Sequence, residues 1–90
     1  HRPKLVVGFS AETEELQKNS IRKLKKKNCD IIVANDVSKK DIGFNSDYNE
    51  VTIIDNDGNY KFFKKNKKSI IAKKVVEIIL DKLVSEKNLN

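Results

Sequence analysis

The sequence predicts an α/β fold, a Rossmann-like fragment with elements in the order β-α-β, β-hairpin and α. Short apolar runs flank a segment with helical spacing, an Asp-Gly turn follows between strand-like runs, and the chain closes on a second helical segment. A strand, a helix and a further strand in succession require a parallel pair, and parallel strands normally belong to larger, covered sheets. We therefore expect the chain to complete a larger, mostly parallel sheet.

The first strand is predicted over residues 5–9 and the first helix over residues 11–27. Residues 5–9 are an apolar run of strand length. Ser10 is a candidate N-cap for the helix, whose first turn is acidic and whose last turn is rich in lysine, as the helix dipole favours. A narrow apolar stripe supports the helix and consists of Leu16, Ile21 and Leu24.

The second strand is predicted over residues 31–34, a continuous apolar run typical of a buried strand. The Asp-Gly dipeptide at 57–58 lies between strand-like runs at 51–55 and 59–63, and it is the strongest short-range hairpin signal. Apolar side chains recur at helical spacing over residues 68–85, which predicts the closing helix. These elements complete the predicted order.

Composition limits the classes of protein to consider. The chain has 90 residues and a net charge of +6, which allows one domain and favours phosphate-bearing partners. Cys29 is the only cysteine, so an internal disulfide and a multi-cysteine metal site are excluded. No apolar run approaches the roughly 20 residues needed to cross a bilayer. We expect a cytoplasmic protein without membrane contact and, because the chain lacks an initiator Met, the end of a longer polypeptide.

Polar residues follow the predicted strand at 31–34, where ligands of open α/β sheets bind. Their amide and carboxyl groups could hydrogen-bond a sugar, and Asp36 or Asp47 could help to hold magnesium, whereas Phe44 is either a stacking platform or a lid over the core. The same Asn- and Asp-rich segment would also form a loop without any ligand. The candidate contacts are Asn35, Asp36, Phe44, Asn45 and Asp47.

Two further features could bind an anion. Residues 8–13 predict a strand-to-helix turn with free backbone N–H groups, although a single glycine is no phosphate-binding fingerprint and the residues alone favour an ordinary turn capped by Ser10. Lys23 and Lys27 stand one helical turn apart, so both ammonium groups can reach one triphosphate. The alternative is a solvated face whose lysines complement the end of the helix.

Several segments resemble a known family. They are His-Arg-Pro at 1–3, Val-Gly-Phe-Ser-Ala-Glu-Thr at 7–13, Ala-Asn-Asp-Val-Ser at 34–38 and Gly-Phe-Asn-Ser-Asp-Tyr-Asn at 43–49. In this order and spacing they are similar to the C-terminal part of bacterial phosphopantothenoylcysteine synthetase, a ligase often fused behind a flavin-dependent decarboxylase. The resemblance implies that residues 1–85 are the C-terminal portion of a nucleotide-binding synthetase domain. The polar residues 86–90 themselves predict a frayed tail.

The resemblance also implies a reaction. CTP and 4′-phosphopantothenate give an acyl-cytidylate and pyrophosphate, and the amine of cysteine then forms the amide and releases CMP. Magnesium neutralises the triphosphate, the family is homodimeric, and FMN is expected only if a decarboxylase domain lies upstream. By motif, Phe9 lies against the cytidine nucleotide, and Lys23 and Lys27 match two CTP-binding lysines.

The sequence departs from the family by what it lacks. The family's upstream motifs, among them a Lys-x-Lys-Lys loop and an Asn-Pro-Asp-Ile segment, do not occur here, so we expect the isolated chain to be inactive. Two other hypotheses remain. The basic run at 22–27 could make the chain a small nucleic-acid-binding module, although it has few aromatic residues and no recognised binding motif. The chain could also serve only as a structural or dimerisation piece.

Overall fold

The computed structural model describes residues 5–39 and 46–88. Along the chain, the elements are β1 (Val7–Glu12), α1 (Leu16–Lys26), β2 (Ile31–Asp36), β3 (Tyr48–Asp55), β4 (Tyr60–Lys67) and α2 (Lys68–Asn88). This is the predicted order of a β-α-β unit, a β-hairpin and a helix, and the prediction of a mixed α/β fold is confirmed. Neither helix of the described part is both long and apolar enough to span a membrane.

The strands form one four-stranded sheet in the order β1-β2-β3-β4. β1 and β2 are parallel and pair without a break from Val7 with Ile31 to Glu12 with Asp36. β2 with β3 and β3 with β4 are antiparallel. The predicted parallel pair is therefore present, but within the described residues the sheet is mixed rather than mostly parallel.

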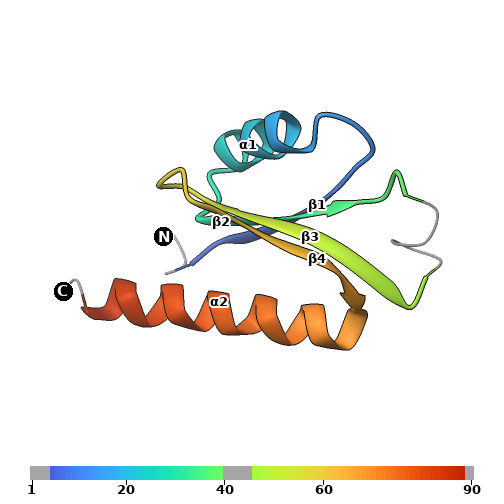
Figure 1. The fold of residues 1–90 in the computed structure, drawn as a ribbon. Helices are drawn as coiled ribbons and strands as arrows, with labels where there is room; N and C mark the ends of the chain where they lie inside the picture. Colours follow the sequence, from blue (N-terminus) through green and yellow to red (C-terminus); the bar gives the residue numbers. More distant parts are fainter. Residues whose placement is uncertain (1–4, 40–45, 89–90) are drawn as a thin grey trace.

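The sheet lies between the two helices, with α1 over one face and α2 under the other (Figure 1). Because side chains of a strand alternate between the faces, each strand feeds both cores. The core under α1 contains Leu24, Cys29, Ile32 and Ile54. The core over α2 contains Ile31, Val33, Val51, Ile53, Ile71 and Val75. The apolar run of β2 is thus buried on both sides, as its composition predicts.

The predicted start of α1 is wrong. Residues 10–12 continue β1 because they keep pairing with residues 34–36 of β2. Ser10 is therefore a strand residue and not an N-cap: its Oγ lies 3.4 Å from the Oγ of Ser20 in the interface with α1. The helix begins at Leu16 after Glu15, which adopts a left-handed conformation with φ of 44°. The proposed anion-binding turn at 8–13 is corrected in the same way, since most of it is strand.

The other strands also extend beyond the predicted ranges. β2 includes Asn35 and Asp36, which the sequence placed just past the strand. β3 begins at Tyr48, β4 continues to Lys67, and α2 continues into the predicted tail as far as Asn88. Polar residues at these ends have low strand propensity, but pairing with a neighbouring strand outweighs it. The hairpin itself is confirmed, with Gly58 at a φ of 89° that favours glycine.

Candidate functional site

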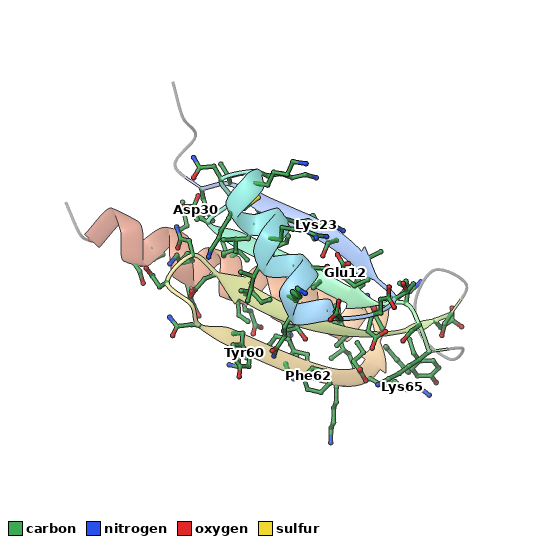
Figure 2. The ribbon with its side chains drawn as sticks, turned by 90° about the horizontal axis from the view of Figure 1, so that it is seen from above. Glu12, Lys23, Asp30, Tyr60, Phe62 and Lys65 are labelled. Carbon is green, nitrogen blue, oxygen red and sulfur yellow. The ribbon has the colours of Figure 1, made fainter. Side chains whose placement is uncertain are left out.

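The candidate site lies where β1 and β2 end and β3 begins. Glu12 and Asp36, the last residues of two parallel strands, are neighbours in the sheet. Asn35 precedes Asp36 on β2, and Asn49 lies near the start of β3. Lys23 reaches the same region from α1 (Figure 2). We call these five residues the strand-end site, since ligands of open α/β sheets bind beyond the carboxyl ends of parallel strands.

Lys23 is held in this site by an ion pair. Its Nζ lies 2.6 Å from Oε2 of Glu12, whose side chain is only 7% exposed, whereas the Lys23 side chain is 37% exposed. α1 begins just after β1 ends, and helical side chains lean toward the N-terminus of their helix, so Lys23 extends back toward the strand ends. A buried carboxylate is costly unless it is paired, which explains why the contact forms.

Lys27 lies one turn farther along α1 and differs from Lys23 in its surroundings. It caps the helix, and its backbone N–H donates to the carbonyl oxygen of Lys23 at 3.0 Å. The Lys27 side chain is exposed and forms no ion pair with any residue that the structure describes. Their i,i+4 spacing places the two lysines on one side of the helix, with Lys23 ion-paired and Lys27 exposed.

Phe9 lies on the opposite face of β1. Val7 packs against the core over α2, and Phe9, two residues later, points to the same face. Its side chain is largely exposed, at 66% for the residue, and β1 is an edge strand of the sheet that the described residues form. The described chain thus does not bring Phe9 together with Lys23 and Lys27. A ligand that contacts all three has to cross the end of β1.

Asn35 lies on the same face as Phe9. Phe9 pairs with Val33 and Ala11 with Asn35, so Phe9 and Asn35 are two residues apart on adjoining strands. The Nδ2 of Asn49 donates to the Oδ1 of Asn35 at 2.9 Å and links β2 to β3 at this point. The strand-end site therefore has an amide pair on the side of α2 and an ion pair on the side of α1.

Asp36 is engaged in a local turn. Its Oδ1 accepts hydrogen bonds from the backbone N–H and the hydroxyl of Ser38. The Ser38 hydroxyl is the main cause that lowers the pKa of Asp36; burial opposes the effect, while the Ser38 amide and the charge of Lys39 add to it. Lys39 in turn pairs with the buried carboxylate of Glu50 at 2.7 Å. Asp36 thus orients the chain as it leaves β2.

The remaining predicted contacts are less defined. Phe44 and Asn45 lie outside the described residues. Asp47 is exposed, and its carbonyl oxygen accepts from the backbone N–H of Lys68 at 3.0 Å. Across residues 5–39 and 46–88, no group of three or more His, Cys, Asp or Glu side chains could hold a metal ion.

Sequence reasoning missed Glu12. It was assigned to the acidic first turn of the helix, because the strand was predicted to stop at residue 9. The alternation of Gly8, Ser10 and Glu12, small or polar at every second position, is the signal that could have revealed a strand facing a helix closely. Gly8 leaves so little space that an added Cβ would lie 2.9 Å from Sγ of Cys29.

The chain is similar to known proteins along almost its whole length. The model of the family described as DNA/pantothenate metabolism flavoprotein C-terminal domain matches residues 1–83. The coenzyme A biosynthesis bifunctional protein CoaBC of Escherichia coli K12 is 40% identical over 91 residues, which cover 98% of this chain and 21% of that protein. A cysteine/cysteine sulfinic acid decarboxylase from an unknown prokaryotic organism is 38% identical over 84% of this chain and 21% of its own length.

A solved structure agrees with the sequence comparison. The crystal structure of the C-terminal domain of a CoaBC protein superposes with a TM-score of 0.72 and 30% sequence identity, over 90% of this chain and 36% of that chain. The present chain spans about a fifth of the length of the curated relatives named above. It belongs to the family of the DNA/pantothenate metabolism flavoprotein C-terminal domain.

Proposed function

We propose that this chain is the CTP-binding portion of a phosphopantothenate–cysteine ligase in coenzyme A biosynthesis. The observation that carries the proposal is the ammonium group of Lys23, held 2.6 Å from Glu12 at the strand ends, with Lys27 one turn away on the same helix. Membership of the family and the resemblance to the CoaBC protein of E. coli support it. The proposed location is cytoplasmic.

In this proposal the chain contributes charge to the first step of the reaction. CTP and 4′-phosphopantothenate form an acyl-cytidylate, pyrophosphate leaves, and cysteine then displaces CMP. Lys23 and Lys27 bind the triphosphate and stabilise the negative charge that develops on the leaving pyrophosphate. Magnesium would reach the site with the nucleotide, and we assign it no ligand and no step in this chain.

The nucleotide crosses the carboxyl end of β1 in this arrangement. Its phosphates lie on the side of α1, where Lys23 and Lys27 are, and its nucleoside lies on the side of Phe9 and Asn35. The exposed aromatic ring of Phe9 is available for an apolar contact with the base or sugar. This placement accounts for matched residues on both sides of β1, with Phe9 on the side of α2 and the two lysines on the side of α1.

The rest of the active site is proposed to come from outside these residues. β1 is an edge strand, and the chain covers 36% of the similar solved chain, so further strands alongside β1 would give the larger, mostly parallel sheet. The isolated chain is then expected to be inactive. We also expect a homodimer, which sedimentation of the complete protein would test.

The test of the proposal is the affinity of the complete synthetase for CTP. Lys23→Ala and Lys27→Ala should each weaken CTP binding by about 10- to 150-fold, since a hydrogen bond to a charged group contributes about 1.5–3 kcal/mol. Isothermal titration calorimetry gives the dissociation constants. Lys25→Ala is the matched control, because Lys25 is an exposed lysine two residues from both Lys23 and Lys27, and residues two apart on a helix do not face each other. If Lys23→Ala and Lys27→Ala both leave the dissociation constant at the control value, the proposal fails.

A further inference from the structure

Glu12 is a buried carboxylate at a place where function needs positive charge. Its side chain is 7% exposed, and its described contact is the 2.6 Å ion pair with Lys23. A negative charge beside a triphosphate site reduces the attraction of the ligand. If the only requirement at this position were positive charge, the chain would bind a triphosphate better without the Glu12 carboxylate. The carboxylate must therefore offer something other than attraction.

The ion pair fixes one end of a long, flexible side chain. A lysine loses up to about 2 kcal/mol of rotamer freedom when it is ordered. Glu12 orders Lys23 before any ligand arrives, and a lysine ammonium has three N–H donors, so the contact with Glu12 leaves donors for a phosphate. The Lys23 side chain is 37% exposed, so a ligand can reach these donors.

We propose that Glu12 is a positioning residue that holds the ammonium group of Lys23 in place for the triphosphate of CTP, from which pyrophosphate leaves, whereas the exposed Lys27 supplies attraction. The inference rests on the proposed function and adds a division of labour between the two lysines. Neighbouring contacts support a fixed geometry: Ser10 and Ser20 meet in the same interface, and Gly8 allows the close approach of Cys29.

The division of labour gives opposite effects on binding and rate. Glu12→Gln keeps the size of the side chain and removes its charge. CTP affinity should stay the same or increase, because the loss of a nearby negative charge at least offsets the cost of ordering Lys23 when the nucleotide binds. The rate of pyrophosphate release should fall by about 10- to 100-fold, since displacement of a positioned group by about 1 Å can cost that much.

The experiment measures the CTP dissociation constant and the single-turnover rate of pyrophosphate release in the complete synthetase. Glu14→Gln is the control, because Glu14 is an exposed glutamate on the segment between β1 and α1. A double-mutant cycle then adds Glu12→Gln to Lys23→Ala. If Glu12 acts through Lys23, the second substitution should slow the reaction no further.

Three results would separate the possibilities. If Glu12→Gln leaves the rate unchanged, or slows it equally in the presence and absence of Lys23, the positioning role is overturned. If Lys23→Ala and Lys27→Ala both leave CTP affinity at the control value, the proposed function has failed instead. If Glu12→Gln does not fold, Glu12→Asp is the second variant, since it retains the charge but moves the carboxylate back by one methylene. Glu12→Asp should slow pyrophosphate release without weakening CTP binding. An unchanged rate again overturns the positioning role.

Discussion

Two buried carboxylates lie toward opposite ends of the sheet and are satisfied in different ways (Figure 2). Glu12 at the carboxyl ends of the parallel strands receives the ammonium group of Lys23, a half-exposed side chain with donors to spare. Asp30, just before β2, accepts hydrogen bonds from the backbone N–H of Val6 at 2.7 Å and from Nδ2 of Asn56 at 3.2 Å. Both carboxylates are buried, so the difference between them is the partner: an ammonium group for Glu12 and amide N–H groups for Asp30.

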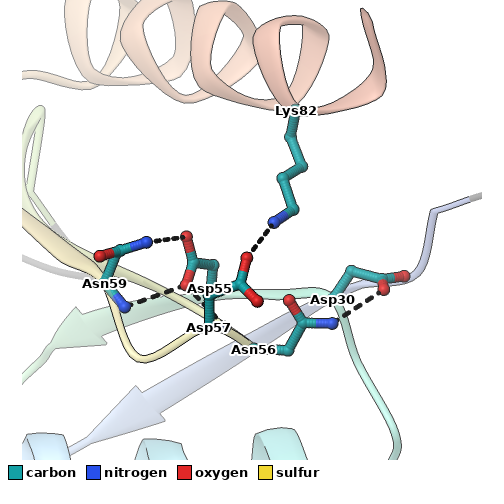
Figure 3. A network of polar contacts seen from close by, with 6 residues as sticks. All are labelled: Asp30, Asp55, Asn56, Asp57, Asn59 and Lys82. Atoms are coloured by element: carbon teal, nitrogen blue, oxygen red, sulfur yellow. Dashed lines mark hydrogen bonds and ion pairs between the residues drawn. The ribbon is translucent and has the colours of Figure 1, made fainter. Parts of the chain in front are cut away.

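The Asp30 end is built to connect segments of the chain. The backbone of Asp30 also bonds to Val6 and to Asn56, so one residue links the start of β1, the start of β2 and the hairpin. Around it, Asp55 accepts hydrogen bonds within the hairpin turn, and Lys82 of α2 pairs with Asp57 at 3.1 Å (Figure 3). These carboxylates bind groups of the chain itself, so we interpret this end as structural and the strand-end site as the place for a ligand.

The largest effect on stability is expected from Asp30→Ala. The substitution leaves the N–H groups of Val6 and Asn56 without their acceptor, and hydrogen bonds to a charged group contribute about 1.5–3 kcal/mol each. We expect the free energy of unfolding to fall by about 3 kcal/mol, measured by urea denaturation, with CTP affinity unchanged. Asp57→Ala at the same end is the control and should cost under about 1 kcal/mol, because the Asp57 side chain is 70% exposed. A loss of CTP affinity in folded Asp30→Ala would break the comparison.

Gly8→Ala is expected to have a smaller effect, which lowers both the free energy of unfolding and the affinity for CTP. The new Cβ would lie 2.9 Å from the buried Sγ of Cys29, so Cys29, in the segment that joins α1 to β2, has to shift, at a cost of about 1–3 kcal/mol for overpacking. The backbone N–H of Cys29 donates to the carbonyl oxygen of Leu24 in α1, so the shift should reach the helix that carries Lys23 and weaken CTP binding as well. Calorimetry and denaturation measure the two effects. Adding Cys29→Ala should relieve the contact and restore both; no restoration would contradict the packing explanation.

The smallest effect concerns Asp36, whose pKa is lowered mainly by the Ser38 hydroxyl. A carboxylate with a lowered folded-state pKa adds stability above its unfolded pKa of about 3.9 and loses it as the pH falls through the folded value. Ser38→Ala should therefore raise the pKa of Asp36, as seen by NMR titration. The accompanying loss of stability, a few tenths of a kcal/mol at this partly exposed group, should be present at neutral pH and vanish in acid. An unchanged titration of Asp36 would exclude this role of Ser38.

The sequence predicted the elements well and their ends poorly. Apolar runs and the Asp-Gly turn correctly indicated the strands, the hairpin and both helices. The failures at Ser10, at Asn35 and Asp36 and at the end of β4 have one cause. Polar residues there have no local preference for a strand, and only pairing with a neighbouring strand, which is remote in sequence, makes them one.

The candidate site was predictable to a similar extent. The i,i+4 spacing of Lys23 and Lys27 was visible in the sequence, and the structure places both on one side of α1. The role of Glu12 was not visible in the sequence, since it depends on β1 continuing three residues beyond its apolar part. The position of Phe9 on the other face of β1 follows from the same alternation of side chains along that strand.

The division between a binding end and a structural end is tested most directly by CTP affinity and stability measured together for two variants of the complete synthetase. Lys27→Ala should weaken CTP binding at least about tenfold and change the free energy of unfolding by no more than about 1 kcal/mol, since only an exposed charge at a helix end is lost. Asp30→Ala should do the reverse. If Lys27→Ala leaves CTP affinity intact while Asp30→Ala abolishes it in the folded protein, the account is contradicted.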